Sequence, residues 1–190
     1  MRKIVTFSSL LLLASTASAD WSLNSSESDF SFSSIKKGTV LESHSFTNFD
    51  SQIDSKGLAT LSIDLTSVST GIEIRDERMK SMLFDTPTFG QATFKTQLDP
   101  AKIDMQKAGD IVSTKITGTL SLHGIEKELS ADVNIIKLTD NKIMVSTAEP
   151  IAIKAADFGL DAGVTALKEV AKLPSISFAV PVNFNLTYSK

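Results

Sequence analysis

The 190-residue chain contains no cysteine and only two histidines. Without cysteine it has no disulfide bond and no thiolate nucleophile. The histidines, His44 and His123, are not part of an H-E-x-x-H-like zinc pattern, and no serine lies in a G-x-S-x-G elbow. These absences argue against a metal site and against the common nucleophilic enzymes, so we expect a binding protein rather than an enzyme.

Basic residues are outnumbered by acidic ones, 19 against 22, and large aromatic side chains with a polar group are scarce. The formal net charge is −3, and there are one Trp and one Tyr. An acidic balance argues against nucleic acid or anionic lipid headgroups as the main partner. A barrel that spans an outer membrane carries an aromatic girdle at each interface, which two such residues do not supply. A small outer-membrane β-barrel nevertheless stays an alternative.

The first 19 residues have the features of a secretory signal peptide. Met1-Arg2-Lys3 is a basic start, residues 4–13 form a mainly apolar core, and Ala17-Ser18-Ala19 is a small-x-small cleavage site. The apolar stretch falls short of the ~20 residues that a membrane-spanning helix needs. We therefore expect residues 1–19 to be removed and residues 20–190 to form one domain in a bacterial periplasm, with secretion beyond it as an alternative.

The end of the chain carries a strict two-residue period. From Ile176 to Tyr188 every second residue is apolar, and those between are small or polar. Only a β-strand sends successive side chains to opposite faces. A strand this long is typical of barrels, whose inner row of side chains either fills a core or lines a ligand cavity.

Similar alternation recurs along the chain and predicts about eight strands at hairpin spacing, the number at which an antiparallel sheet closes on itself. Two segments have helical spacing instead, at residues 73–84 and 162–172, and the second ends before Pro174. The prediction is an all-β fold, an eight-stranded antiparallel β-barrel with two short helices inserted between strands.

A succession of short motifs resembles the YceI-like family of exported, polyisoprenoid-binding bacterial proteins. Arg75-Asp76 opens the first helix and Phe84-Asp85 closes it, Gly118 to Gly124 reads GTLSLHG, and Asp157-Phe158-Gly159 precedes the second helix. The resemblance covers the chain from about Trp21 to Tyr188. It implies a lipocalin-like barrel that holds a long isoprenoid chain, of the quinone or polyprenyl phosphate type, in an apolar pore.

The resemblance also implies which side chains bind this lipid, the only bound group that we expect. The predicted pore residues are Phe30, Phe32, Ile63, Phe94, Ile116, Leu120, Phe178, Val180, Val182 and Phe184. The predicted headgroup residues are Arg75, Asp76 and His123, because an arginine fork binds phosphate oxygens or carbonyl groups. A structural role is open for each of the three, as an ion pair and helix cap for Arg75 and Asp76 and as a turn residue for His123.

One further alternative is a stress-related scaffold that binds a protein partner without an isoprenoid. A lipid extracted from the purified protein distinguishes the carrier from this scaffold, and cell fractionation distinguishes the carrier from a membrane barrel. The sequence makes no prediction of oligomeric state.

Overall fold

The alternating segments form β-strands in the computed structural model, which describes residues 20–190. The predicted signal peptide lies outside the described residues. The strands in this range are β1 (Trp21–Leu23), β2 (Asp29–Lys36), β3 (Val40–Phe46), β4 (Phe49–Ile53), β5 (Leu58–Asp64), β6 (Val68–Ser69), β7 (Gln91–Gln97), β8 (Ile111–Leu122), β9 (Ile125–Thr139), β10 (Lys142–Thr147), β11 (Ile151–Lys154) and β12 (Ala179–Ser189). The helical elements are η1 (Ser25–Glu27), η2 (Leu65–Ser67), α1 (Glu73–Arg78), η3 (Met79–Phe84), α2 (Pro100–Asp104), η4 (Ala155–Phe158) and α3 (Asp161–Val170).

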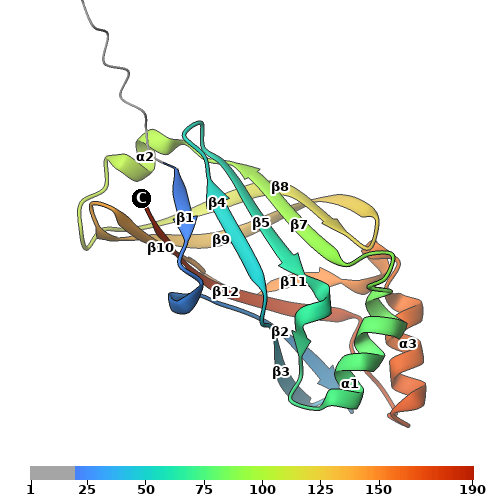
Figure 1. Cartoon of the computed structure of the whole chain (residues 1–190). Helices are drawn as coiled ribbons and strands as arrows, with labels where there is room; N and C mark the ends of the chain where they lie inside the picture. Colours follow the sequence, from blue (N-terminus) through green and yellow to red (C-terminus); the bar gives the residue numbers. More distant parts are fainter. Residues whose placement is uncertain (1–19) are drawn as a thin grey trace, which may run out of the picture.

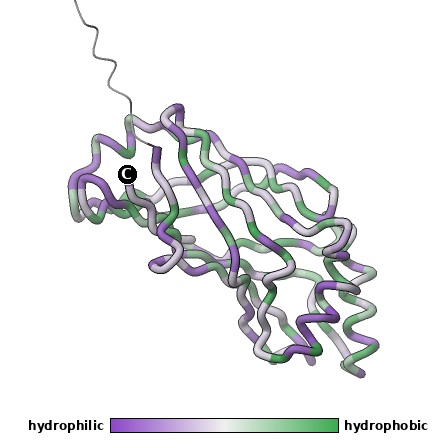
Figure 2. Tube along the Cα trace, in the orientation of Figure 1, coloured by the Kyte–Doolittle hydropathy of each residue, from purple (hydrophilic) through white to green (hydrophobic). Residues whose placement is uncertain are grey.

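Eight of these strands close into an antiparallel barrel (Figure 1). Their order is β1-β4-β5-β7-β8-β9-β10-β12, and β12 returns to pair with β1. The short strand β1 makes the closure, because Trp21 lies opposite Ile53 of β4 and Leu23 lies opposite Tyr188 of β12. The predicted eight-stranded barrel is thereby confirmed, and Figure 2 shows the alternation of hydrophobic and hydrophilic residues along its strands.

The last strand is long enough to have two neighbours on each edge. One edge pairs with β10 and then β11, and the other pairs with β1 and then β2. Beyond β2 the sheet continues through β3 to β6, outside the closed ring. One end of the molecule is therefore built by β2, β3, β6 and β11 rather than by the ring itself.

The predicted start of this last strand is wrong by three residues. β12 begins at Ala179, and Ile176 makes only an isolated bridge to Lys36. The hydroxyl of Ser177 donates to the Ala179 carbonyl oxygen over 2.9 Å and accepts from the Ala179 N–H over 3.1 Å. Such local side-chain bonds compete with the strand ladder, so the chain turns before it enters the sheet.

Both predicted helical segments are present at the same end of the barrel (Figure 1). Residues 73–84 form α1 and continue as the π-helical η3, and the second segment forms α3. The two pack closely, because Gly163 of α3 has no side chain: a Cβ there would lie 2.7 Å from the Met82 carbonyl oxygen. The third helix, α2, was not predicted from the sequence.

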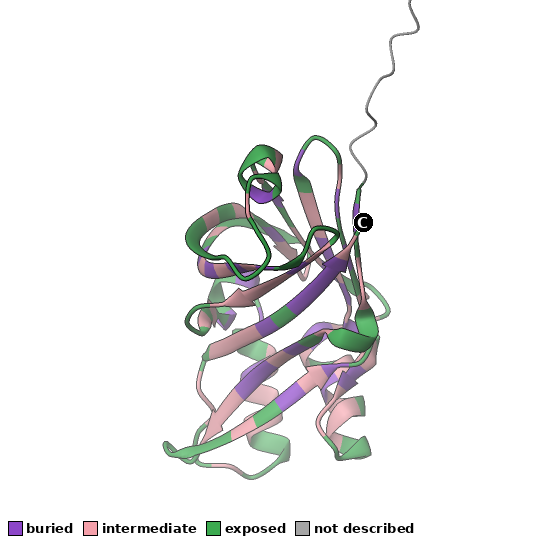
Figure 3. Ribbon diagram, turned by 90° about the vertical axis from the view of Figure 1, so that its left-hand side faces the viewer, coloured by how far each residue is buried: buried purple, intermediate pink, exposed green. Residues whose placement is uncertain are grey.

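The opposite end of the barrel is filled. There α2 supplies Ile103, which is buried in the same core as Trp21. The ammonium groups of Lys137 and Lys190 lie 5.1 and 4.6 Å from the centroid of the Trp21 ring, and Lys190 also pairs with Asp104 of α2. Figure 3 shows that buried residues lie along the strands and that the turns at both ends are exposed.

Candidate functional site

The inside of the barrel holds an apolar cavity of about 160 Å³, which we call the inner chamber. All of its lining side chains are aliphatic or phenyl groups. They are Phe30, Phe32, Phe46, Leu61, Ile63, Leu65, Leu83, Phe84, Ala92, Phe94, Ile116, Leu120, Leu122, Leu129, Ala131, Ile151, Ile153, Ala155, Leu160, Val164, Val180, Val182 and Phe184. Such a surface offers no hydrogen bond, so it suits a hydrocarbon.

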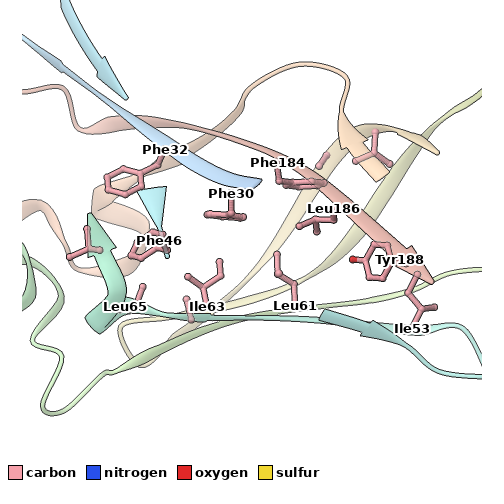
Figure 4. Packing of buried hydrophobic residues seen from close by; sticks show 14 of the residues in the cluster. Phe30, Phe32, Phe46, Ile53, Leu61, Ile63, Leu65, Phe184, Leu186 and Tyr188 are labelled. Carbon is pink, nitrogen blue, oxygen red and sulfur yellow. The ribbon is translucent and has the colours of Figure 1, made fainter. Parts of the chain in front are cut away.

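The register between β2 and β12 places phenyl rings along one wall of the inner chamber. Phe184 lies opposite Phe30, and their rings are stacked with centroids 6.4 Å apart. Phe32 stacks on Phe46 at 5.1 Å, and Phe46 reaches Phe84 of η3 at 5.9 Å. In Figure 4 the rings of Phe30, Phe32 and Phe184 lie across the interior from the aliphatic side chains of Leu61, Ile63 and Leu65.

A second cavity of about 330 Å³ lies at the helical end, and we call it the outer chamber. Four residues line both chambers and separate them, namely Phe32, Leu83, Val164 and Val180. Unlike the inner chamber, the outer one also has polar side chains in its wall. These are Ser33, Ser34, Lys36, Glu42, His44, Arg75, Arg78 and Ser177.

Glu42 organises the charged part of the outer chamber. Its carboxylate accepts from Lys36 Nζ over 2.7 Å and from Arg75 Nη1 over 2.8 Å. The hydrogen bond from Lys36, with the positive charges of Lys36 and Arg75, holds the pKa of Glu42 below its ordinary value against an opposing desolvation effect. The carboxylate is thus ionised and neutralises one of the two cations beside it.

His44 is the buried polar residue of the outer chamber, with 5% of its surface exposed. Its Nε2 lies 2.9 Å from the Ser34 hydroxyl, whereas its buried Nδ1 has no hydrogen-bond partner. Arg75 Nε is also buried without a partner. Burial, followed by the charge of Arg75, lowers the pKa of His44, so the ring is neutral at neutral pH.

Nine of the ten predicted pore residues line the inner chamber, and their binding of a ligand stays a prediction. Phe178 does not line it. Its side chain is 48% exposed, because the turn at Ser177 keeps this residue outside the strand.

Of the three predicted headgroup residues, Arg75 and Asp76 lie together at Thr70, and His123 lies elsewhere. Arg75 lines the outer chamber, and its Nη2 donates to the Thr70 carbonyl oxygen over 2.6 Å. Asp76 accepts from the Thr70 N–H over 2.8 Å and has a structural role there. His123 occupies the β8–β9 turn, packs on Phe89 at 4.4 Å between centroids, and lines neither chamber.

Sequence reasoning left Glu42 and His44 out of the site. A signal was present, because Val40, Glu42, His44 and Phe46 share one face of a strand and two of them are polar. Within residues 20–190, no group of His, Asp and Glu side chains is arranged to hold a metal ion. No helix in the same range has the length and apolar character required to cross a membrane.

The architecture is that of a barrel that encloses an apolar space, the class to which ligand-holding eight-stranded barrels belong. A sequence profile of the YceI-like domain matches residues 21–188, and the chain belongs to this family. No curated protein matches the chain significantly.

Solved structures agree with the family. A domain from Saccharophagus degradans, described as polyisoprenoid binding and implicated in plant cell wall breakdown, is 39% identical, with a TM-score of 0.87 over 89% of this chain and 97% of that one. BcnA of Burkholderia cenocepacia is 20% identical, with a TM-score of 0.67 over 87% and 98% of the two chains. The YceI protein of Campylobacter jejuni is 21% identical, with a TM-score of 0.57 over 77% and 84%. The last two show a shared fold.

Proposed function

We propose that this protein binds an isoprenoid lipid without chemical change and that the inner chamber holds part of its hydrocarbon tail. The observation that carries the proposal is the wholly apolar wall of this chamber. Each buried methylene group is worth about 0.8 kcal/mol, so a tail provides affinity without polar contacts. The polyisoprenoid-binding description of the 39% identical Saccharophagus degradans domain supports the same ligand class.

The two volumes limit how a long tail is accommodated. An apolar cavity of about 150 Å³ holds one benzene, so the inner chamber at 160 Å³ receives only a short part of a tail. With the outer chamber of 330 Å³, the space reaches the range of ordinary ligand pockets. The dividing side chains, such as Leu83 and Val164, must therefore turn aside for a tail that extends through both.

The polar wall of the outer chamber supports a place for the headgroup there. His44 Nδ1 is a buried nitrogen without a partner, and such an atom costs about 1–3 kcal/mol unless a ligand or water satisfies it. Arg75 uses Nη1 for Glu42 and Nη2 for Thr70, which leaves its buried Nε without a partner, and the adjacent ionised Glu42 carboxylate repels a phosphate group. We therefore favour a neutral, carbonyl-bearing headgroup of the quinone type over a polyprenyl phosphate.

We further propose that the chain acts in a periplasm after removal of residues 1–19. Fractionation of the host cell, with N-terminal sequencing of the mature chain, tests this proposal. Recovery in the soluble periplasmic fraction with Asp20 first supports it. Recovery only in the detergent-extracted outer membrane supports the membrane-barrel alternative instead.

Lipid binding is tested with a matched pair of alanine variants. Ala131 is 6% exposed and lines the inner chamber, whereas Ala152 of β11 is exposed. We expect Ala131→Phe to abolish uptake of an isoprenoid quinone by the delipidated protein, because the phenyl ring occupies the cavity. Ala152→Phe is expected to leave uptake unchanged. Equal uptake by all three proteins contradicts the proposal.

The headgroup is tested by competition on the wild-type protein. A quinone and a polyprenyl phosphate with tails of equal length are offered together, and the bound lipid is measured by native mass spectrometry. Preference for the quinone supports a neutral headgroup. Preference for the phosphate overturns that part of the proposal and leaves tail binding intact.

A further inference from the structure

Three segments surround the opening of the outer chamber, and we call them the rim: residues 36–42, 72–80 and 164–177. The three segments lie together at one end of the molecule, opposite α2 (Figures 1 and 3). Backbone and side-chain contacts join them. The Lys37 N–H donates to the Ser175 carbonyl oxygen over 3.1 Å, and Arg75 pairs with Glu42.

The rim exposes aliphatic side chains at the entrance to an apolar space. Ile72, Ile74 and Val170 are 51%, 58% and 39% exposed, yet each also lines the outer chamber. Leu41, at 62% exposed, lies near the tip of the β2–β3 hairpin. Because the same side chains face the chamber and the solvent, the chamber opens through the rim.

Positive charge is concentrated on the rim although the chain is acidic. The three segments contain seven Lys and Arg against five Asp and Glu, a net charge of +2, whereas the whole chain carries −3. The rim therefore has an excess of positive charge although the net charge of the whole chain is negative. A lipid headgroup surface of negative charge is the complement of this end of the molecule.

Two exposed lysines of the rim hold backbone conformations that lysine rarely adopts. Lys37 has φ +54° and Lys172 has φ +52°, in the left-handed region. Glycine or asparagine occupies this region at lower cost. Neither lysine has an ion-pair partner among the described residues. The β2–β3 turn and the end of α3 account for these conformations, and they leave both exposed ammonium groups available to a surface outside the fold.

We propose that the rim docks on an anionic membrane surface, with its aliphatic side chains in the interface and Lys37 and Lys172 on lipid phosphates. An isoprenoid then passes between bilayer and chamber without crossing water. This second step rests on the proposed lipid binding, whereas docking itself requires no bound isoprenoid. A protein partner or a second copy of the chain has no need of an opening that leads to an apolar cavity.

The test uses the delipidated protein and vesicles that contain no isoprenoid. Sedimentation with vesicles of equal parts phosphatidylcholine and phosphatidylglycerol is compared with phosphatidylcholine alone. We expect binding to the anionic vesicles that weakens as salt is added. Replacing both lysines (Lys37→Asn, Lys172→Asn) is expected to weaken it about fivefold for each charge without loss of thermal stability, since asparagine tolerates the left-handed region.

Matched controls come from the opposite end. The double variant Lys56→Asn, Lys107→Asn makes the same charge change there, and we expect it to bind as the wild type does. Ile72→Ser with Ile74→Ser is expected to weaken binding, whereas Met105→Ser with Ile111→Ser, at positions 74% and 65% exposed, is not. Equal losses in the rim and control variants overturn the proposal. So does equal binding to neutral vesicles, or a rim-dependent dimer that does not bind vesicles.

Lipid retention distinguishes failure of docking from failure of the proposed function. The lysine variant (Lys37→Asn, Lys172→Asn), whose positions line neither chamber, is expected to keep quinone loaded in detergent and to transfer it slowly to vesicles. Rim variants that bind vesicles normally overturn docking even if they carry lipid. Wild type that docks but takes up no quinone overturns the carrier proposal alone.

Discussion

Arg75 of α1 donates from Nη1 to Oε2 of Glu42 in β3 over 2.8 Å, and this ion pair ties the helical end of the molecule to the sheet. The other Glu42 oxygen accepts from Lys36 at 2.7 Å. One carboxylate therefore serves two cations at the wall of the outer chamber, and its removal leaves both without their partner.

Glu42→Gln is expected to change ligand preference more than stability. Since the Glu42 side chain is 33% exposed and those of Lys36 and Arg75 are 24% and 28% exposed, the free energy of unfolding should fall by no more than about 1 kcal/mol. The freed arginine fork should raise the affinity for a polyprenyl phosphate relative to a quinone. Urea unfolding and the lipid competition measure the two effects. Asp132→Asn, which breaks an exposed pair with Lys115, is the control, and a loss of stability without a change in preference contradicts the expectation.

The burial of His44 leads us to expect that the folded protein loses stability in mild acid. Burial and the charges of Arg75 and Lys36 lower its pKa from 6.5 in the fold, against the opposing charges of Glu42 and Asp76. The unfolded chain then binds the proton more readily, so stability is complete above pH 6.5 and falls as the pH drops below it. Melting temperatures measured across this range should show the decline. It should disappear in His44→Gln and persist in His123→Gln, and an unchanged decline in His44→Gln contradicts the assignment.

A side chain added at Gly163 is expected to push η3 and α3 apart beside the outer chamber. The Cβ of Gly163→Ala would lie 2.7 Å from the Met82 carbonyl oxygen and 2.8 Å from the Leu83 Cα. Backbone atoms yield only if the helices move, so we expect a destabilisation of about 1–3 kcal/mol and faster lipid exchange. Stopped-flow transfer between protein and vesicles measures the rate. Ala162→Ser, at an exposed neighbouring position, should change neither quantity.

The burial of Tyr188 at the filled end of the barrel leads us to expect a loss of stability at alkaline pH. Its hydroxyl lies 2.8 Å from that of Ser51, and burial raises its pKa to about 12. The unfolded chain ionises near pH 10, so stability should fall as the pH rises from 10 towards 12. This is the single tyrosine of the chain, and phenolate absorbance should therefore appear together with unfolding. Absorbance that appears in the folded protein near pH 10 contradicts the burial argument.

Tyr188→Phe is expected to affect the filled end of the barrel without affecting the lipid-binding end. Ser51 Oγ donates to the Thr60 carbonyl oxygen over 2.9 Å, so the tyrosine hydroxyl is its donor, and its loss should cost about 1–2 kcal/mol. Lipid uptake should not change, because this residue lines neither chamber. A variant with normal stability or with impaired uptake contradicts the expectation.

The inner chamber was predictable because side-chain direction in a strand depends only on the two-residue period. Phe30, Val182 and Phe184 face inward for this reason. Phe178 has the same parity and lies outside, since the hydroxyl of Ser177 forms a local turn that the period does not reveal. The outer chamber was not predictable, because its wall joins β2, β3, α1 and α3, which are distant in the chain.

By itself the sequence determined that the chain forms an antiparallel barrel with an apolar interior, because alternation dictates which side chains share a face. Only the tertiary structure decided that Trp21 and Ile103 fill one end while cavities remain at the other. It also decided that His44 and Arg75 meet at the wall of the outer chamber. These outcomes depend on how side-chain volumes from separate elements fill a common space, and no periodicity along one segment encodes that sum.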